Sequence, residues 1–121
     1  MAEDDHDLRI ALTQFLRSHG YRVDSVANGA ALLDRLSEFL LSGGKAPADV
    51  IVTDVRMPGF SGLSIVEGLR MNGWSQPLVV ISAFGDREMH QRVARLGRAA
   101  MIDKPFDGDE LREKIEELLA S

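Results

Sequence analysis

The chain has 121 residues, of which 45% are hydrophobic and 27% are charged, and this is typical of one soluble domain with its own core. It has no cysteine, which excludes a disulfide framework, a thiol nucleophile and a cysteine-based zinc site. A net charge of -5 argues against direct nucleic-acid binding, and no apolar run approaches the roughly 20 residues of a membrane helix, so we expect a cytoplasmic protein without membrane contact.

The first half of the chain alternates helical and extended patterns. Apolar side chains recur at helical spacing across residues 5–20 and again across 28–44, and both patterns end in glycine. Between them, residues 21–27 alternate in polarity and predict a short strand. After a loop at 45–48, residues 49–54 form a nearly continuous β-branched run, which is typical of a strand buried on both faces of a parallel sheet.

The second half continues this alternation. The patterns predict a helix over 61–72, a buried strand over 77–82, a helix over 86–96, a weak strand over 99–103 and a last helix that follows. Asp107 and Glu110 form a capping-box pattern at the start of the last helix, and Asp5 is expected to cap the first. Helices that alternate with short apolar strands predict a parallel sheet with helices on both faces.

Polar side chains stand where the predicted strands end. Asp54 and Ser82 close two of the apolar runs, Lys104 follows a third, and Glu3 and Asp4 precede the first helix, where an earlier strand would end. The carboxyl ends of parallel strands form the ligand site of open α/β sheets. Carboxylates without cysteine or clustered histidine suit Mg²⁺, while a lysine and a hydroxyl suit a phosphate group. An aspartate can itself be the nucleophile of phosphoryl transfer.

Four motifs make the chain similar to a known family. They are "EDD" at 3–5, "DVRMPGFSG" at 54–62, "VVISA" at 79–83 and "DKPF" at 103–106. Together and in this order they resemble the receiver domain of bacterial two-component response regulators, and we interpret residues 3–120 as one such domain. The resemblance implies a flavodoxin-like, doubly wound parallel sheet of five strands in the order 2-1-3-4-5.

The resemblance also implies roles for the polar residues. Asp54 would accept a phosphoryl group from a sensor histidine kinase or a phosphotransfer protein, Ser82 and Lys104 would contact that group, and the Lys104-Pro105 peptide would be cis. Mg²⁺ would be held by Glu3, mainly through water, by Asp4, by Asp54 and by the backbone carbonyl of Arg56. Such a domain catalyses only its own aspartyl phosphorylation and dephosphorylation and is not otherwise an enzyme.

Two departures from the family pattern stand out. Only Met1 and Ala2 stand where receiver domains usually have about five apolar residues, so the first strand is truncated or missing. This predicts either abnormal stability or a homodimer formed by strand swapping, because neighbouring backbone groups would lack partners. Met101 stands three residues before Lys104, where the family commonly has an aromatic side chain that turns inward on phosphorylation.

The expected output surface comprises the last two helices and the strand between them. The helix expected over 86–96 and the residues just after it are basic, with Arg87, Arg92, Arg95 and Arg98. The last helix is acidic, with Glu113, Glu116 and Glu117. Such a surface could pair with a second copy or simply be solvated. Arg56 and Phe84, beside the site, are expected to influence the rate of dephosphorylation.

Two other functions are consistent with the same fold. A pseudo-receiver would keep the fold as a protein interaction module without being phosphorylated, because the truncated strand would misplace Glu3 and Asp4. An aspartate-based phosphatase is disfavoured, since Arg56 stands where that class places a second aspartate as general acid.

Overall fold

The computed structural model describes residues 1–41, 49–57, 61–83 and 87–120. The sequence expectations that concern Gly43, Gly44, residues 45–48, Phe84 and Asp86 lie outside these described residues. The elements in chain order are α1 (His6–Ser18), α2 (Gly29–Leu41), β1 (Ile51–Asp54), α3 (Gly62–Met71), β2 (Leu78–Ser82), α4 (Arg87–Leu96), β3 (Ala99–Asp103) and α5 (Gly108–Ala120).

The helices begin where the sequence predicts. The side chain of Asp5 accepts a hydrogen bond from the Leu8 N–H at 3.0 Å, and Asp107 accepts one from the Glu110 N–H at 2.9 Å. Both predicted caps are therefore confirmed. After α1 the chain reverses at Gly20, whose φ of 91° lies in the left-handed region that glycine adopts without strain.

The three strands form a parallel sheet in the order β1-β2-β3. Ile51 is paired with Leu78, and Leu78 with Ala99, so the strands start level with one another. Every residue of β1 and β2 is buried. This confirms the prediction of strands covered on both faces, which explains their continuous apolar runs.

The expected first two strands are reduced to single bridging residues. Ala2 bridges Thr53 on one side and Val26 on the other, both in parallel. The segments therefore lie in the predicted order 2-1-3-4-5, with Val26 at the edge and Ala2 next to β1. The prediction of a strand over 21–27 is wrong. The neighbouring segment in the sheet pairs through Ala2 alone, so within 21–27 only Val26 forms a bridge.

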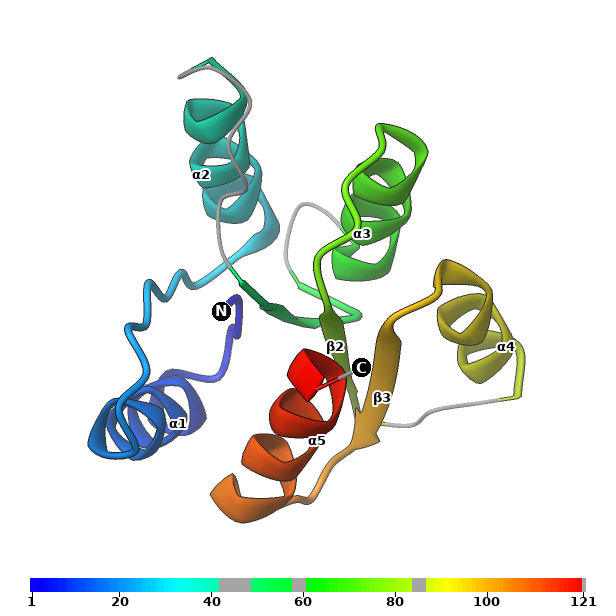
Figure 1. Cartoon of the computed structure of the whole chain (residues 1–121). Helices are drawn as coiled ribbons and strands as arrows, with labels where there is room; N and C mark the ends of the chain where they lie inside the picture. The colour runs from blue at the N-terminus through cyan, green and yellow to red at the C-terminus, as the bar shows by residue number, and fades with distance from the viewer. Residues whose placement is uncertain (42–48, 58–60, 84–86, 121) are drawn as a thin grey trace.

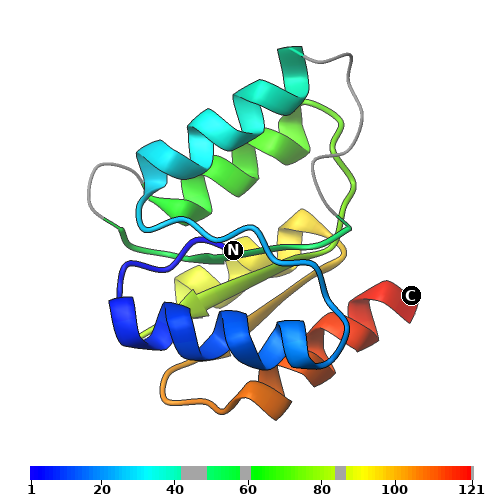
Figure 2. The ribbon, with the colours of Figure 1, turned by 90° about the vertical axis from the view of Figure 1, so that its left-hand side faces the viewer.

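Helices cover both faces of the sheet, as the views along and across it show (Figures 1 and 2). On one face, α1 and α5 pack over a cluster that includes Leu12, Val79 and Ile115. On the other, α2, α3 and α4 pack over a cluster that includes Leu36, Val66 and Val93. The sheet is thus held between two apolar layers, which fixes the positions of its strand ends.

Candidate functional site

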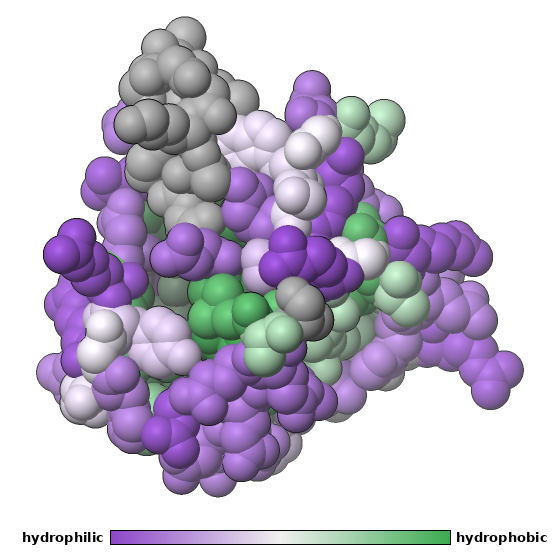
Figure 3. Space-filling view, viewed as in Figure 1, coloured by the Kyte–Doolittle hydropathy of each residue, from purple (hydrophilic) through white to green (hydrophobic). Residues whose placement is uncertain are grey.

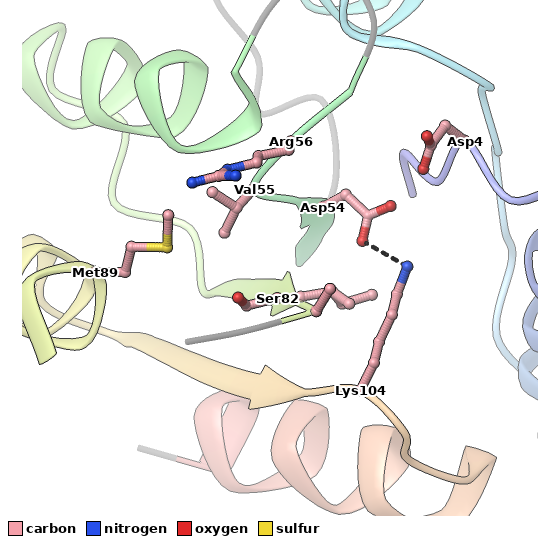
Figure 4. Close-up of a pocket in the computed structure, with 9 residues that line it drawn as sticks. Asp4, Asp54, Val55, Arg56, Ser82, Met89 and Lys104 are labelled. Atoms are coloured by element: carbon pink, nitrogen blue, oxygen red, sulfur yellow. Dashed lines mark ion pairs between the residues drawn. The ribbon is translucent and has the colours of Figure 1, made fainter. Parts of the chain in front are cut away.

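The polar strand ends meet at one edge of the sheet. A pocket of about 280 Å³ opens there and is lined by Asp4, Asp54, Val55, Arg56, Ile81, Ser82, Ala83, Met89 and Lys104. Asp54 occupies its centre, with Lys104 pointing toward it and with Asp4 and Ser82 to either side (Figure 4). The structure therefore brings these predicted site residues together from four separate segments of the chain.

Asp54 is the last residue of β1 and is 3% exposed. Its backbone N–H donates to the Ala2 carbonyl at 3.0 Å, which ties it to the amino-terminal segment. Its backbone carbonyl lies against Gly62 at the start of α3, where a Cβ would approach this oxygen to 1.8 Å. Only glycine permits this approach, and it holds α3 and the site together.

Lys104 supplies the cation of the site. Its backbone N–H donates to the Ser82 carbonyl at 2.7 Å, so the chain just after β3 is fixed beside the end of β2. Its Nζ lies 2.9 Å from Glu3 Oε1 and 3.5 Å from Asp54 Oδ1. The Glu3 contact is an ion pair without aligned hydrogen-bond geometry. One ammonium group is therefore shared between two buried carboxylates. The peptide that follows, Lys104-Pro105, is cis as expected.

Glu3 and Asp4 have different environments. Glu3 is fully buried, and its backbone carbonyl accepts a hydrogen bond from the Arg9 guanidinium at 3.0 Å, whereas Asp4 is exposed. Sequence reasoning missed the role of Arg9, since an arginine one turn into a helix resembles any solvated charge. Glu3 contacts Lys104 and is absent from the pocket lining, so Asp4 is the member of the acidic pair that faces the pocket.

The donor set fits a divalent cation. Oxygens of Glu3, Asp4 and Asp54 lie within 4.8 Å of one another. Three carboxylates with one lysine leave an excess of two negative charges when all are ionised. Asp54 Oδ2 is buried and has no hydrogen-bond partner in the described part of the chain. Hard oxygen ligands with excess negative charge are the set that Mg²⁺ prefers.

The pKa of Asp54 is raised above its ordinary value of 3.8, mainly because burial disfavours the charged carboxylate. The charge of Lys104, a hydrogen bond from Lys104 and one from the backbone N–H of Asp4 act in the opposite direction and stabilise the anion. The anionic form of Asp54 is therefore more basic than that of a solvated aspartate, which favours its use as a nucleophile.

Ser82 and Arg56 complete the predicted set. Ser82 ends β2, is 4% exposed and lines the pocket beside Asp54. Arg56 is exposed, and its backbone forms an antiparallel bridge with Ser61, which holds the start of the loop after β1. Met89 of α4 also lines the pocket. Its sequence pattern gave no sign of this, because a methionine at helical spacing is usually a core residue.

Acidic groups and a partly buried lysine at the carboxyl ends of parallel strands occupy the edge where doubly wound α/β proteins commonly have their ligand sites. A family model described as "Response regulator receiver domain" matches residues 1–116. The chain therefore belongs to the response regulator receiver domain family, as its four motifs predicted. Members of this family are generally not catalytic enzymes.

Curated relatives are bacterial signalling proteins. The chain is 27% identical over 119 residues to sporulation initiation phosphotransferase F of Bacillus subtilis, covering 98% of this chain and 90% of the relative. It is 35% identical over 105 residues to the transcriptional regulatory protein FixJ of Azorhizobium caulinodans, covering 87% of this chain and 46% of the relative. The chain thus spans most of the first relative and about half of the second.

Solved receiver domains have the same fold. The Francisella response regulator 1452 receiver domain superposes with a TM-score of 0.81 at 26% identity, covering 98% of this chain and 93% of that one. The chemotaxis response regulator CheY4 of Vibrio cholerae gives a TM-score of 0.80 at 25% identity, covering 97% and 93%. This confirms the predicted fold class. Among the described helices none is long and apolar enough to cross a membrane.

Proposed function

We propose that residues 3–120 form one receiver domain that accepts a phosphoryl group on Asp54 from the phosphohistidine of a sensor histidine kinase or phosphotransfer protein. The Asp54 carboxylate carries this proposal. It ends a buried strand, lines the pocket, faces Lys104 with one oxygen, and has no hydrogen bond to its second oxygen within the described residues. The similarity to a relative named as a phosphotransferase supports it.

The proposed transfer uses three side chains directly. A carboxylate oxygen of Asp54 attacks phosphorus and forms a P–O bond, while the P–N bond breaks and the histidine nitrogen leaves with the electron pair. Lys104 pairs with one phosphoryl oxygen, and the Ser82 hydroxyl donates a hydrogen bond to another. Attack of water on the acyl phosphate later restores Asp54. The domain thus acts only on its own modification.

Glu3, Asp4, Asp54 and the Arg56 carbonyl would hold Mg²⁺. When bound, the ion supplies charge neutralisation for the phosphoryl oxygens. The excess of two negative charges around Asp54 supports this assignment. A phosphoryl group would add further negative charge beside Asp54, where Lys104 supplies one positive charge. A bound cation would neutralise the remainder.

A pseudo-receiver remains the second candidate. The observation that favours it is the attachment of Glu3 and Asp4 to a central strand that is represented by the single bridging residue Ala2. In this case the fold would serve only to bind a protein partner in the cytoplasm. The partner surface in either case is proposed to be that of α4, β3 and α5, including pairing with a second copy.

Intact-mass spectrometry after incubation with Mg²⁺ and acetyl phosphate separates the two candidates. We expect the unmodified chain to gain one phosphoryl group and Asp54→Asn to gain none. Asp103→Asn is the matched control, because Asp103 is a nearby carboxylate that pairs with His90 outside the pocket at 3.5 Å. Phosphorylation absent from a folded protein, or retained in Asp54→Asn, would refute the Asp54 proposal.

A further inference from the structure

The segment that carries the acidic pair is held from α1 by one arginine. Arg9 lies one turn into α1, and its Nη1 donates a hydrogen bond to the Glu3 carbonyl at 3.0 Å. Its Nη2 lies 3.1 Å from Nδ1 of His6, and because a guanidinium can only donate, this ring nitrogen accepts. Two nitrogens of the guanidinium are therefore fixed, which sets its plane against the Glu3 carbonyl.

The environment of Arg9 differs from that of other charged residues in α1. The space-filling view shows mainly hydrophilic side chains at the lower left, where Figure 1 places this helix (Figure 3). Asp7 and Arg17 of α1 are exposed, whereas Arg9 is half-buried. Arg9 does not line the Asp54 pocket, so it does not face a ligand there. Its effect on the site must therefore pass through the backbone that it contacts.

This contact reaches the peptide group that joins Glu3 to Asp4. In the described part of the chain the Lys104-Pro105 bond is the cis peptide, so the Glu3-Asp4 peptide is trans and its carbonyl and N–H point to opposite sides. The carbonyl accepts from Arg9, and the N–H faces Asp54, whose anionic form it stabilises. The guanidinium, the peptide group and the carboxylate thus form a continuous series of polar contacts that polarise one another in the same direction.

Asp4 depends on this peptide group for its position. Its side chain is exposed and lies on one side of Asp54 in the pocket (Figure 4). The next hydrogen bond along the segment is long, at 3.4 Å from the Asp5 N–H to Glu3 Oε2. Rotation of the Glu3-Asp4 peptide would turn its N–H away from Asp54. It would also separate carboxylate oxygens that lie within 4.8 Å of one another.

We propose that Arg9 is a positioning residue for the acidic pair, which holds the Glu3 carbonyl and thereby directs the N–H and the carboxylate of Asp4 toward Asp54. It touches neither a cation nor a phosphoryl group. The contact stands on the geometry of residues 3–9, and its consequence for Mg²⁺ binding rests on the proposed function. The positive charge of Arg9 would by itself repel a cation, so positioning and charge act in opposite directions and can be separated.

Two substitutions of Arg9 make this separation. Arg9→Lys keeps the charge but loses the planar arrangement of donors, and Arg9→Met removes both. We expect the affinity for Mg²⁺, measured by calorimetry, to fall about tenfold in both variants, as is common when a residue that orients a metal ligand is lost. Activity is not needed for this measurement.

Arg17 provides the matched control. It belongs to the same helix, and its guanidinium donates to the Val23 carbonyl at 2.8 Å, away from the pocket. Arg17→Lys and Arg17→Met are expected to change the affinity for Mg²⁺ by less than about twofold, because a distant exposed charge is screened at physiological ionic strength. Urea unfolding of all four variants reports any general loss of stability.

A second readout needs no cation. In the NMR spectrum of the Mg²⁺-free protein, the Asp4 amide resonance is expected to move in both Arg9 variants and to stay in place in both Arg17 variants. The reason is that this amide belongs to the peptide group that Arg9 contacts. An Asp4 resonance that is unchanged in Arg9→Met would contradict the proposed role.

The other outcomes are equally distinct. An Mg²⁺ affinity unchanged in Arg9→Lys and raised in Arg9→Met would show that Arg9 acts through charge alone and would overturn the proposal. An equal loss in the Arg17 variants would do the same, since it would indicate general destabilisation. No Mg²⁺ binding by the unmodified chain would refute the cation site and the role of Arg9 together. Binding that depends on Arg9, without phosphorylation by acetyl phosphate, would support the positioning role and refute only the proposed phosphoryl transfer.

Discussion

At the scale of single residues, the site depends on how the ammonium group of Lys104 is shared between the carboxylates of Glu3 and Asp54. Lys104 Nζ lies closer to Glu3, at 2.9 Å, than to Asp54, at 3.5 Å. Because Glu3 is fully buried, its charge depends on this ammonium group and on the backbone N–H of Asp5, which donates to Oε2 at 3.4 Å. A phosphoryl group or a cation in the pocket would change how Lys104 is shared, so Lys104 links Glu3 to Asp54.

Lys104→Met is expected to destabilise the protein in the absence of Mg²⁺ by about 2 kcal/mol, because it leaves the buried Glu3 carboxylate unpaired. Mg²⁺ is expected to restore part of the loss. Urea unfolding with and without Mg²⁺ measures both effects. Lys114→Met is the control, since the Lys114 side chain is 42% exposed and lies 4.0 Å from Glu117, and it should change stability by less than about 0.5 kcal/mol. Equal effects of the two substitutions would contradict this account.

Asp54 gives a prediction about pH. Its pKa is raised in the folded protein, so its ionised form destabilises the fold relative to the unfolded chain, and this effect is absent below the ordinary pKa of 3.8. Asp54→Asn is therefore expected to raise the free energy of unfolding at pH 7 without Mg²⁺. The gain should shrink as the pH falls through the raised pKa and vanish below 3.8.

Urea unfolding across this pH range measures the difference between the Asp54→Asn variant and the unmodified chain. Asp109→Asn provides the control, because Asp109 is exposed and pairs with Arg112 within α5. We expect no stabilisation from it at pH 7. A gain from Asp54→Asn that grew toward low pH would have the wrong sign and would rule out burial as the cause.

At the scale of elements, the junction between β1 and α3 positions Asp54. Gly62 donates its N–H to the Val55 carbonyl at 2.8 Å and lies against the Asp54 backbone. Ser61 caps α3 and also donates its hydroxyl to the Val55 carbonyl at 3.1 Å. The start of α3 is thereby fixed to Asp54 and Val55, so a small displacement of the helix would move Asp54.

Gly62→Ala should disrupt this junction, because the added Cβ would lie 1.8 Å from the Asp54 carbonyl oxygen and 2.6 Å from Thr53 Oγ1. We expect a loss of about 2–3 kcal/mol and slower phosphorylation by acetyl phosphate. Gly68→Ala is the matched control in the same helix, where a Cβ meets nothing within 4 Å. It should stabilise by about 0.5–1 kcal/mol. Thermal unfolding and phosphorylation rates of the two variants test this prediction, and equal effects of the two substitutions would contradict it.

Two arginines of the α4, β3 and α5 surface also make contacts within the molecule. Arg92 forms an ion pair with Glu67 of α3, and the Arg98 guanidinium donates to the Ser75 carbonyl at 3.1 Å. Arg92 is half-buried, while Arg98, Arg87 and Arg95 are all exposed. Met101 of β3 is partly buried against the core under α2, α3 and α4. It is therefore a packing residue in this structure.

At the scale of the whole molecule, the sheet is asymmetric in its backbone pairing. The β1-β2-β3 side has continuous ladders between two apolar layers, whereas the opposite side is held by the bridges of Ala2. Opening of a region requires less free energy where fewer backbone bonds and apolar contacts must break. The edge at residues 21–26 should therefore open well below the global unfolding free energy.

Native-state hydrogen exchange tests this asymmetry. The amides of Val79, Val80 and Ile81 are expected to exchange only through global unfolding, and that of Val26 at least about a hundredfold faster. Protection should fall along the sheet from β2 toward Val26. Uniform protection across all these amides would show that the short central segment is as stable as the full ladders.

Local patterns in the sequence determined the helices, the three strands, the caps at Asp5 and Asp107 and the candidate site residues, because periodicity, capping and strand-end polarity act over a few neighbouring residues. The tertiary structure decided what depends on distant partners. Residues 21–27 have a strand pattern but only Val26 pairs, since a strand needs a neighbour of comparable length. Burial and the meeting of segments decided that Lys104 pairs with Glu3 and that Asp54 has a raised pKa.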